Sequence, residues 1–170
     1  TGNYAEAIFN YKGTINITGE TIITGKINNQ TEGTINIQGG NIISSFINAI
    51  CSYGSINMTG GMIVATKGVG IYNDSGKLNI QGGNIDAFKS GIENWGDATI
   101  TGGIITGGKG NHNYSKAGVD NYGNVNIGIK DGIINGEEPR ILGKIGIFNH
   151  HLDSICNYYD GKILGKENAL

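Results

Sequence analysis

The stretch Gly13-Thr14-Ile15-Asn16-Ile17-Thr18-Gly19 decides the fold, because the chain repeats it at regular intervals. Close copies occupy residues 33–39, 54–60 and 76–82, and weaker copies begin at residues 96, 123 and 161. The closing glycines of the first five copies lie 20 to 22 residues apart. A fixed period of this length indicates a stacked architecture, in which each repeat buries its apolar face against its neighbours.

Each repeat contains three short apolar segments separated by glycine corners. In the quoted stretch Ile15 and Ile17 alternate with polar residues, which is the two-residue period of a β-strand. The second segment follows a Gly-Gly corner, and the third reads Gly-Ile-x-Asn, as in residues 70–73 and 91–94. No helical spacing of apolar residues is present in the sequence.

Aligned copies place like residues above like, as parallel strands in register would. One apolar column contains Ile22, Ile42, Ile63, Ile85, Ile105, Ile134 and Ile163. A corner column, expected to form a ladder of asparagine amides, contains Asn10, Asn73, Asn94, Asn121, Asn149 and Asn157. We therefore predict an all-β fold, a parallel β-helix (β-solenoid) of about seven coils of 20–29 residues, right-handed as parallel crossovers usually are.

The repeats predict a single β-helix segment over residues 1–170, which we expect to belong to a longer repetitive protein. The period breaks twice, and this predicts inter-coil loops at 107–116 and 136–144. In the stretch 146–160 either Ile147 or Ile155 can take the inward position. Loops that protrude from a rigid scaffold frequently carry function.

Composition excludes several classes of function. The 170 residues include 31 glycines and one proline, only 15% are charged, and the net charge is −2. With Arg140 as the only arginine, the chain has no basic patch to neutralise phosphates, so we expect no nucleic-acid partner. No apolar run approaches the roughly 18 residues of a membrane span, so we expect none in this segment.

The repeat phrases Gly-Ile-Tyr-Asn (70–73), Leu-Asn-Ile-Gln-Gly-Gly-Asn-Ile (78–85) and Ala-Thr-Ile-Thr-Gly-Gly-Ile-Ile (98–105) carry a family resemblance. They resemble the repetitive, adhesin-like β-helix proteins on the surface of Gram-positive anaerobic bacteria. The resemblance extends over nearly the whole chain. It implies an exported, extracellular or cell-surface protein with an extended stalk, and it implies no catalytic residues.

Two acids have a spacing that matters for catalysis. Glu93 and Asp120 both occupy the x position of Gly-Ile-x-Asn, so they are expected to face outward on neighbouring coils about 5 Å apart. Paired carboxylates at such a distance suit a retaining glycosidase or a calcium site. Two solvated acids on a polar face are the simpler interpretation.

The aromatic residues suggest a binding surface. Tyr11, Tyr53, Trp95 and Tyr122 each follow the corner residue of their coil, whereas Asp74 interrupts this column, and Tyr72 lies in the neighbouring one. Such a stripe can stack on sugar rings, because aromatic faces are apolar and flat. Alternatively, the rings cover one another, as stacked side chains do in cross-β structures.

We expect a non-catalytic, structural and adhesive segment without a cofactor or metal. Its candidate partners are a host or plant glycan, a neighbouring surface protein or, end to end, another copy of itself. A carbohydrate-binding module is the first alternative, and a polysaccharide lyase or glycosidase the second. The candidate ligand-binding residues are Tyr53, Tyr72, Trp95, Tyr122, Glu93 and Asp120.

Overall fold

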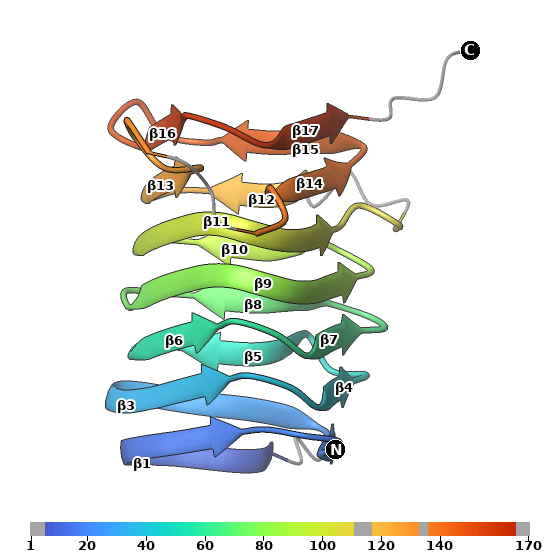
Figure 1. The fold of residues 1–170 in the computed structure, drawn as a ribbon. Helices are drawn as coiled ribbons and strands as arrows, with labels where there is room; N and C mark the ends of the chain where they lie inside the picture. The colour runs from blue at the N-terminus through green and yellow to red at the C-terminus, as the bar shows by residue number, and fades with distance from the viewer. Residues whose placement is uncertain (1–5, 111–116, 133–135, 166–170) are drawn as a thin grey trace.

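The predicted parallel β-helix is confirmed. The computed structural model describes residues 6–110, 117–132 and 136–165, and these residues form 17 strands and no helix. The strands wind into a β-solenoid of about seven turns, stacked from the N-terminal coil to the C-terminal coil (Figure 1). Within the described ranges there is accordingly no helix with the length and hydropathy needed to cross a bilayer.

The strands form three faces, and the strands described within each face pair in parallel. The first face contains the first halves of β1 (Glu6–Ile17) and β3 (Lys26–Ile37), then β5 (Asn48–Ser52), β8 (Val69–Asn73), β10 (Ile92–Asn94), β12 (Ala117–Asn121) and β15 (Ile145–Asn149). The second face contains the second halves of β1 and β3, then β6 (Ser55–Met58), the beginnings of β9 (Lys77–Ala87) and β11 (Asp97–Thr106), β13 (Asn124–Ile127) and β16 (Ile155–Tyr158). The third face contains β2 (Ile22–Thr24), β4 (Asn41–Ser44), β7 (Met62–Ala65), the ends of β9 and β11, β14 (Arg140–Gly143) and β17 (Lys162–Gly165).

The interior is filled by columns of aliphatic side chains. On the third face, four consecutive isoleucines are at most 1% exposed, as the repeat alignment predicted: Ile42, Ile63, Ile85 and Ile105. The corner before this column needs a glycine, because its second residue has a positive φ, for example 78° at Gly40 and 86° at Gly83. L-residues with side chains rarely adopt that conformation.

Two members of the predicted isoleucine column were wrong. Ile22 is 68% exposed, and Ile23 instead pairs with Ile42, because the corner of the first coil contains one residue more than the corners that follow. In the sixth coil the inward position belongs to Ile141, which pairs with Ile105 and Ile163. Ile134, predicted for that position, lies outside the described residues.

The predicted loop at 136–144 was also wrong in part. Residues 140–143 form β14, which pairs with both β11 and β17, so the excess chain lies between the end of β13 at Ile127 and Arg140. The other expected loop falls in the connection from β11 to β12, and its residues 111–116 lie outside the described ranges. In the last coil Ile147 takes the inward position, in register with Val119, whereas Ile155 is exposed.

A buried amide ladder closes the corner between the first and second faces. Hydrogen bonds of 2.7–2.9 Å join Asn73, Asn94, Asn121 and Asn149 in consecutive coils, and another joins Asn10 to Asn29. The predicted member Asn157 belongs elsewhere: its amide donates to Asn126 in a second ladder, on the outer surface of the second face.

Ser52 interrupts the buried ladder. It accepts a hydrogen bond from Asn29, but its own hydroxyl donates to the carbonyl of Gly54 and does not reach Asn73. The buried Oδ1 of Asn73 consequently has no partner among the described residues. A buried acceptor without a donor costs about 1–3 kcal/mol.

Ser52→Asn is expected to raise the free energy of unfolding by about 1 kcal/mol, because the new amide would donate to Asn73 and complete the ladder. The measurement is the shift of the urea midpoint. Ser52→Ala is the matched control and should lower the midpoint, since it removes the acceptor for Asn29. A midpoint for Ser52→Asn at or below that of Ser52→Ala would contradict this account of the corner.

Candidate functional site

The outward position beside the buried ladder brings the predicted acids together on the first face. Glu93 of β10 pairs in register with Asp120 of β12, and Tyr72 of β8 pairs with Glu93 from the other side. Phe148 of β15 continues the column beyond Asp120. The expected adjacency of the two acids is therefore confirmed.

Asp120 is buried, although the sequence predicted an exposed acid. It is only 3% exposed, and its two carboxylate oxygens have different partners. The hydroxyl of Ser90 donates a short hydrogen bond to Oδ2, and Nε2 of His150 lies 3.3 Å from Oδ1. Asp120 thus holds neighbouring segments of the wall together and presents little surface to a ligand.

Glu93 is the accessible member of the pair, being only partly buried. The indole N–H of Trp95 donates to its Oε1 at 3.2 Å. Burial is the main reason that the pKa of Glu93 is raised, and the negative charge of Asp120 adds to the effect. The carboxyl group of Glu93 is consequently easier to protonate than an exposed glutamate.

The next column is a stack of rings. Trp95 and Tyr122 stack with their centroids 4.0 Å apart and their planes 1° from parallel, and Tyr122 and His150 stack at 3.9 Å and 12°. Phe148 meets His150 edge-on at 4.1 Å. Stacked aromatic pairs contribute about 0.5–1.5 kcal/mol beyond the area they bury.

The geometry of this stack shows how far the aromatic rings of the stripe cover one another. Both faces of Tyr122 are covered by neighbouring rings, so the column presents ring edges along most of its length. Trp95 is 44% exposed and has a ring on one face only within the column. Within the stack, Trp95 is thus the ring that remains partly exposed at one end, whereas Tyr11 and Tyr53 are exposed without a stacked ring among the described residues.

The coil that precedes Trp95 has no ring at this position of the column. The preceding coil places Asp74 at this position, and the coil before it places Tyr53 there. The hydroxyl of Tyr72 donates to Oδ1 of Asp74 at 3.0 Å, which fixes the carboxylate beneath Trp95. Burial followed by this hydrogen bond raises the pKa of Tyr72, so the hydroxyl keeps its proton.

The candidate residues are thus divided into two groups. Trp95, Glu93 and Tyr72 lie near Asp74, and Tyr53 lies two coils from Trp95. Tyr122 stacks on Trp95, and Asp120 pairs in register with Glu93. His150 contacts both Tyr122 and Asp120.

Sequence reasoning missed Ser90 and His150. His150 follows Asn149 as Tyr122 follows Asn121, so the register of the repeat is the signal that could have found it. Ser90 precedes Gly91 in the turn before β10, and no sequence pattern marks it as a partner of Asp120.

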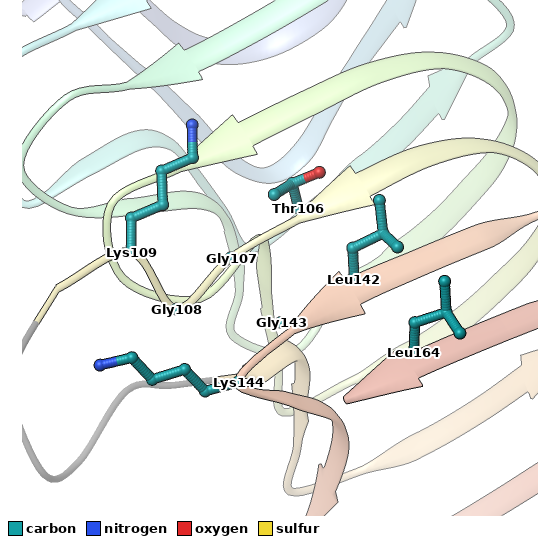
Figure 2. A pocket seen from close by; sticks show the side chains of 8 residues that line it. All are labelled: Thr106, Gly107, Gly108, Lys109, Leu142, Gly143, Lys144 and Leu164. Carbon is teal, nitrogen blue, oxygen red and sulfur yellow. The ribbon is translucent and has the colours of Figure 1, made fainter. Parts of the chain in front are cut away.

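A groove of about 450 Å³ lies elsewhere, where β11, β14 and β17 end on the third face (Figure 2). Leu142 and Leu164 form its apolar side, and Lys109 and Lys144 lie toward the connection from β11 to β12. Lys109 donates to Asp86 at 2.6 Å and Lys144 to the carbonyl of Gly110 at 3.0 Å. Among the described residues that line the groove, Lys109 and Lys144 are the ionisable ones.

No protein-family model, curated protein or solved structure matches the chain. Among the described residues, no group of three or more histidine, cysteine, aspartate or glutamate side chains is placed to hold a metal ion. The cluster of Tyr72, Asp74, Glu93 and Trp95 presents an exposed indole ring and carboxylates that can accept hydrogen bonds.

Proposed function

We propose that the chain is a non-catalytic, extracellular structural and adhesive segment of a bacterial surface protein. The regular interior supports this proposal, because in-register aliphatic columns and an amide ladder produce a rod rather than an enclosed pocket. The rod keeps surface groups at fixed positions for contact with a glycan or a neighbouring surface protein. The repeat phrases that resemble adhesin-like proteins support the same location.

We further propose that the adhesive contact is a sugar residue bound in the gap between Trp95 and Tyr53. The observation that carries this proposal is the exposed Trp95 ring, which stacks on Tyr122 on one side and has Asp74, not a ring, at the same position of the preceding coil. Two coil spacings, about 10 Å, separate Tyr53 from Trp95, and the coil between them has the shorter side chain of Asp74 at this position, over which a sugar ring would lie. Asp74 and Glu93 would accept hydrogen bonds from its hydroxyl groups.

Trp95→Ala is expected to abolish glycan binding, because it removes the stacking face. A glycan array identifies the ligand, and a titration of the indole emission measures affinity, since Trp95 is the only tryptophan. A ligand that stacks on the indole should shift this emission. Binding that survives Trp95→Ala with unchanged affinity would place the site elsewhere.

Two further variants locate the sugar. Asp74→Asn should weaken binding at least tenfold, since a charged acceptor is replaced by a neutral amide. Tyr11→Ala, at the equivalent exposed position of the first coil, should leave affinity unchanged. A uniform loss in all three variants would indicate damage to the rod and not loss of a contact.

The raised pKa of Glu93 favours one alternative, glycoside hydrolysis, because a general acid must hold a proton near neutral pH. Against it, Asp120 is already bonded to Ser90 and His150 and is poorly placed to act as the second carboxylate. Release of reducing sugar from pectins, xylans or bacterial exopolysaccharides that disappears in Glu93→Gln would refute the non-catalytic proposal.

A further inference from the structure

Aromatic and acidic side chains alternate at the corner that Trp95 occupies. Tyr72 and Asp74 come from one coil, and Glu93 and Trp95 come from the next. Tyr72 pairs in register with Glu93, and the backbone hydrogen bonds of the corner place Asp74 and Trp95 at equivalent positions. Each carboxylate therefore has one aromatic residue beside it in its own coil and another in the neighbouring coil.

In both coils the aromatic residue donates a hydrogen bond to the acid. The hydroxyl of Tyr72 donates to Oδ1 of Asp74 at 3.0 Å, and the indole N–H of Trp95 donates to Oε1 of Glu93 at 3.2 Å. No donor from the residues that the structure describes reaches Oδ2 of Asp74 or Oε2 of Glu93. The neutral donors thus orient the carboxylates without neutralising their charge, and one oxygen of each remains for a ligand.

The two carboxylates also lack a basic partner. Among residues 6–110, 117–132 and 136–165, no lysine, arginine or histidine forms an ion pair with Asp74 or Glu93. Burial is the main cause of the raised pKa of Glu93, and the charge of Asp120 raises this pKa further, whereas the charge of Lys89 lowers it by less. Holding this negative charge partly out of water costs free energy, which a bound cation would offset.

Two tyrosines at the corner are affected by the same charges. Burial is the largest cause of the raised pKa of Tyr122, and the other causes are the charges of Glu93 and Asp120. At Tyr72, burial is followed by the hydrogen bond to Asp74 and the charge of that residue, and then by the charge of Glu93. Both hydroxyls therefore lie in a negative potential, which attracts cations and repels anions.

We propose that the glycan bound at this corner carries a protonated amino group, which lies between Asp74 and Glu93 and against the ring of Trp95. This inference rests on the proposed function and narrows its ligand to a sugar with a free, unacetylated amine. An ammonium group donates up to three hydrogen bonds, which is enough for both free carboxylate oxygens. It is also attracted to aromatic faces, and most strongly to that of tryptophan.

Two other charged ligands fit the corner less well. A polymer of sugar acids would bring its own carboxylates close to Asp74 and Glu93, and like charges repel one another at this range. Calcium takes about six to eight oxygen ligands, whereas two of the four side chains at this corner present aromatic rings. An organic ammonium group makes use of both the rings and the carboxylates.

Three oligosaccharides of equal length and linkage test the amino group. They are β-1,4-linked chains of glucosamine, of N-acetylglucosamine and of glucose, which differ only at the second carbon of each ring. Each is titrated at a pH at which the sugar amine is protonated, and the emission of Trp95, the only tryptophan, reports binding. We expect the glucosamine chain to bind at least about tenfold more tightly than the other two, because it alone makes cation–π and charge-assisted contacts.

Two charge-removing variants connect this preference to the corner. Asp74→Asn and Glu93→Gln should each reduce the preference for the glucosamine chain over the glucose chain, because each removes one of the two charges that face the amine. Asp131→Asn is the matched control and should leave the preference unchanged. It removes the same charge from an exposed residue in the turn after β13, where asparagine tolerates the positive φ of 54°.

The outcomes separate this inference from the proposed function. If the glucose or N-acetylglucosamine chain bound as tightly as the glucosamine chain, and Trp95→Ala abolished that binding, this inference would be overturned and the proposed function would stand. An equal loss of preference in Asp131→Asn would also overturn it, since general attraction of a cationic polymer would then explain the binding. If no glycan on the array bound in a manner that depends on Trp95, both proposals would be overturned.

Discussion

Asn94→Ala is expected to lower the free energy of unfolding by about 4 kcal/mol, because several buried hydrogen-bonding groups lose their partners together. The two amide hydrogens of Asn94 are shared among three acceptors, the carbonyls of Gly96 and Asn124 and the side chain of Asn121, and its amide oxygen accepts from Asn73. Asn94 is fully buried, so water cannot replace these bonds. Denaturant unfolding followed by circular dichroism measures the loss.

Asn79→Ala is the matched control, since Asn79 donates to Asn57 in the outer ladder but is exposed. Water replaces its hydrogen bonds, so the loss should stay below about 1 kcal/mol. Similar losses in the two variants would mean that burial does not decide the strength of the ladders.

Ile85→Ala is expected to lower the free energy of unfolding by about 2–5 kcal/mol, the usual cost of truncating a buried isoleucine. Ile85 is 1% exposed and lies between Ile63 and Ile105 in its column. The Cγ2 atom of Ile85 lies where a Cβ atom on Gly70 would be. Because Gly70 has no side chain, it cannot fill the cavity that truncation of Ile85 would leave. The measurement is again the denaturant midpoint and slope.

Ile22→Ala provides the comparison for this prediction. Ile22 is largely exposed, next to the true column member Ile23, and its truncation should change stability by less than about 0.5 kcal/mol. If Ile22→Ala were as costly as Ile85→Ala, the register assigned to the first coil would be wrong.

The sequence was sufficient to predict the coils because their period is short and each strand pairs with its own copy. That is why Ile42, Ile63, Ile85 and Ile105 were assigned correctly. It failed where a corner has a different length: one added residue displaced Ile22 from the column, and the longer connection before Arg140 hid β14. A corner of different length leaves the local sequence pattern intact but shifts the register of the strands that follow. This shift is visible only in the contacts between coils.

The candidate site was predictable only in its positions. The repeat placed Glu93 beside Asp120 and Trp95 beside Tyr122 correctly. Whether a side chain at such a position is free or covered depends on neighbours from other coils, and here Ser90 and His150 cover Asp120. The orientation of the rings, which makes Trp95, Tyr122 and His150 a stack, is likewise set by tertiary packing.

The serine that interrupts the buried ladder has a mechanical consequence. Hydrogen bonds between coils run along the axis of the rod, so a pulling force on its two ends passes through every junction between coils in series. Tensile strength is then set by the weakest junction and not by the average one. At the junction between Ser52 and Asn73 the backbone pairing continues while the amide ladder transmits no load.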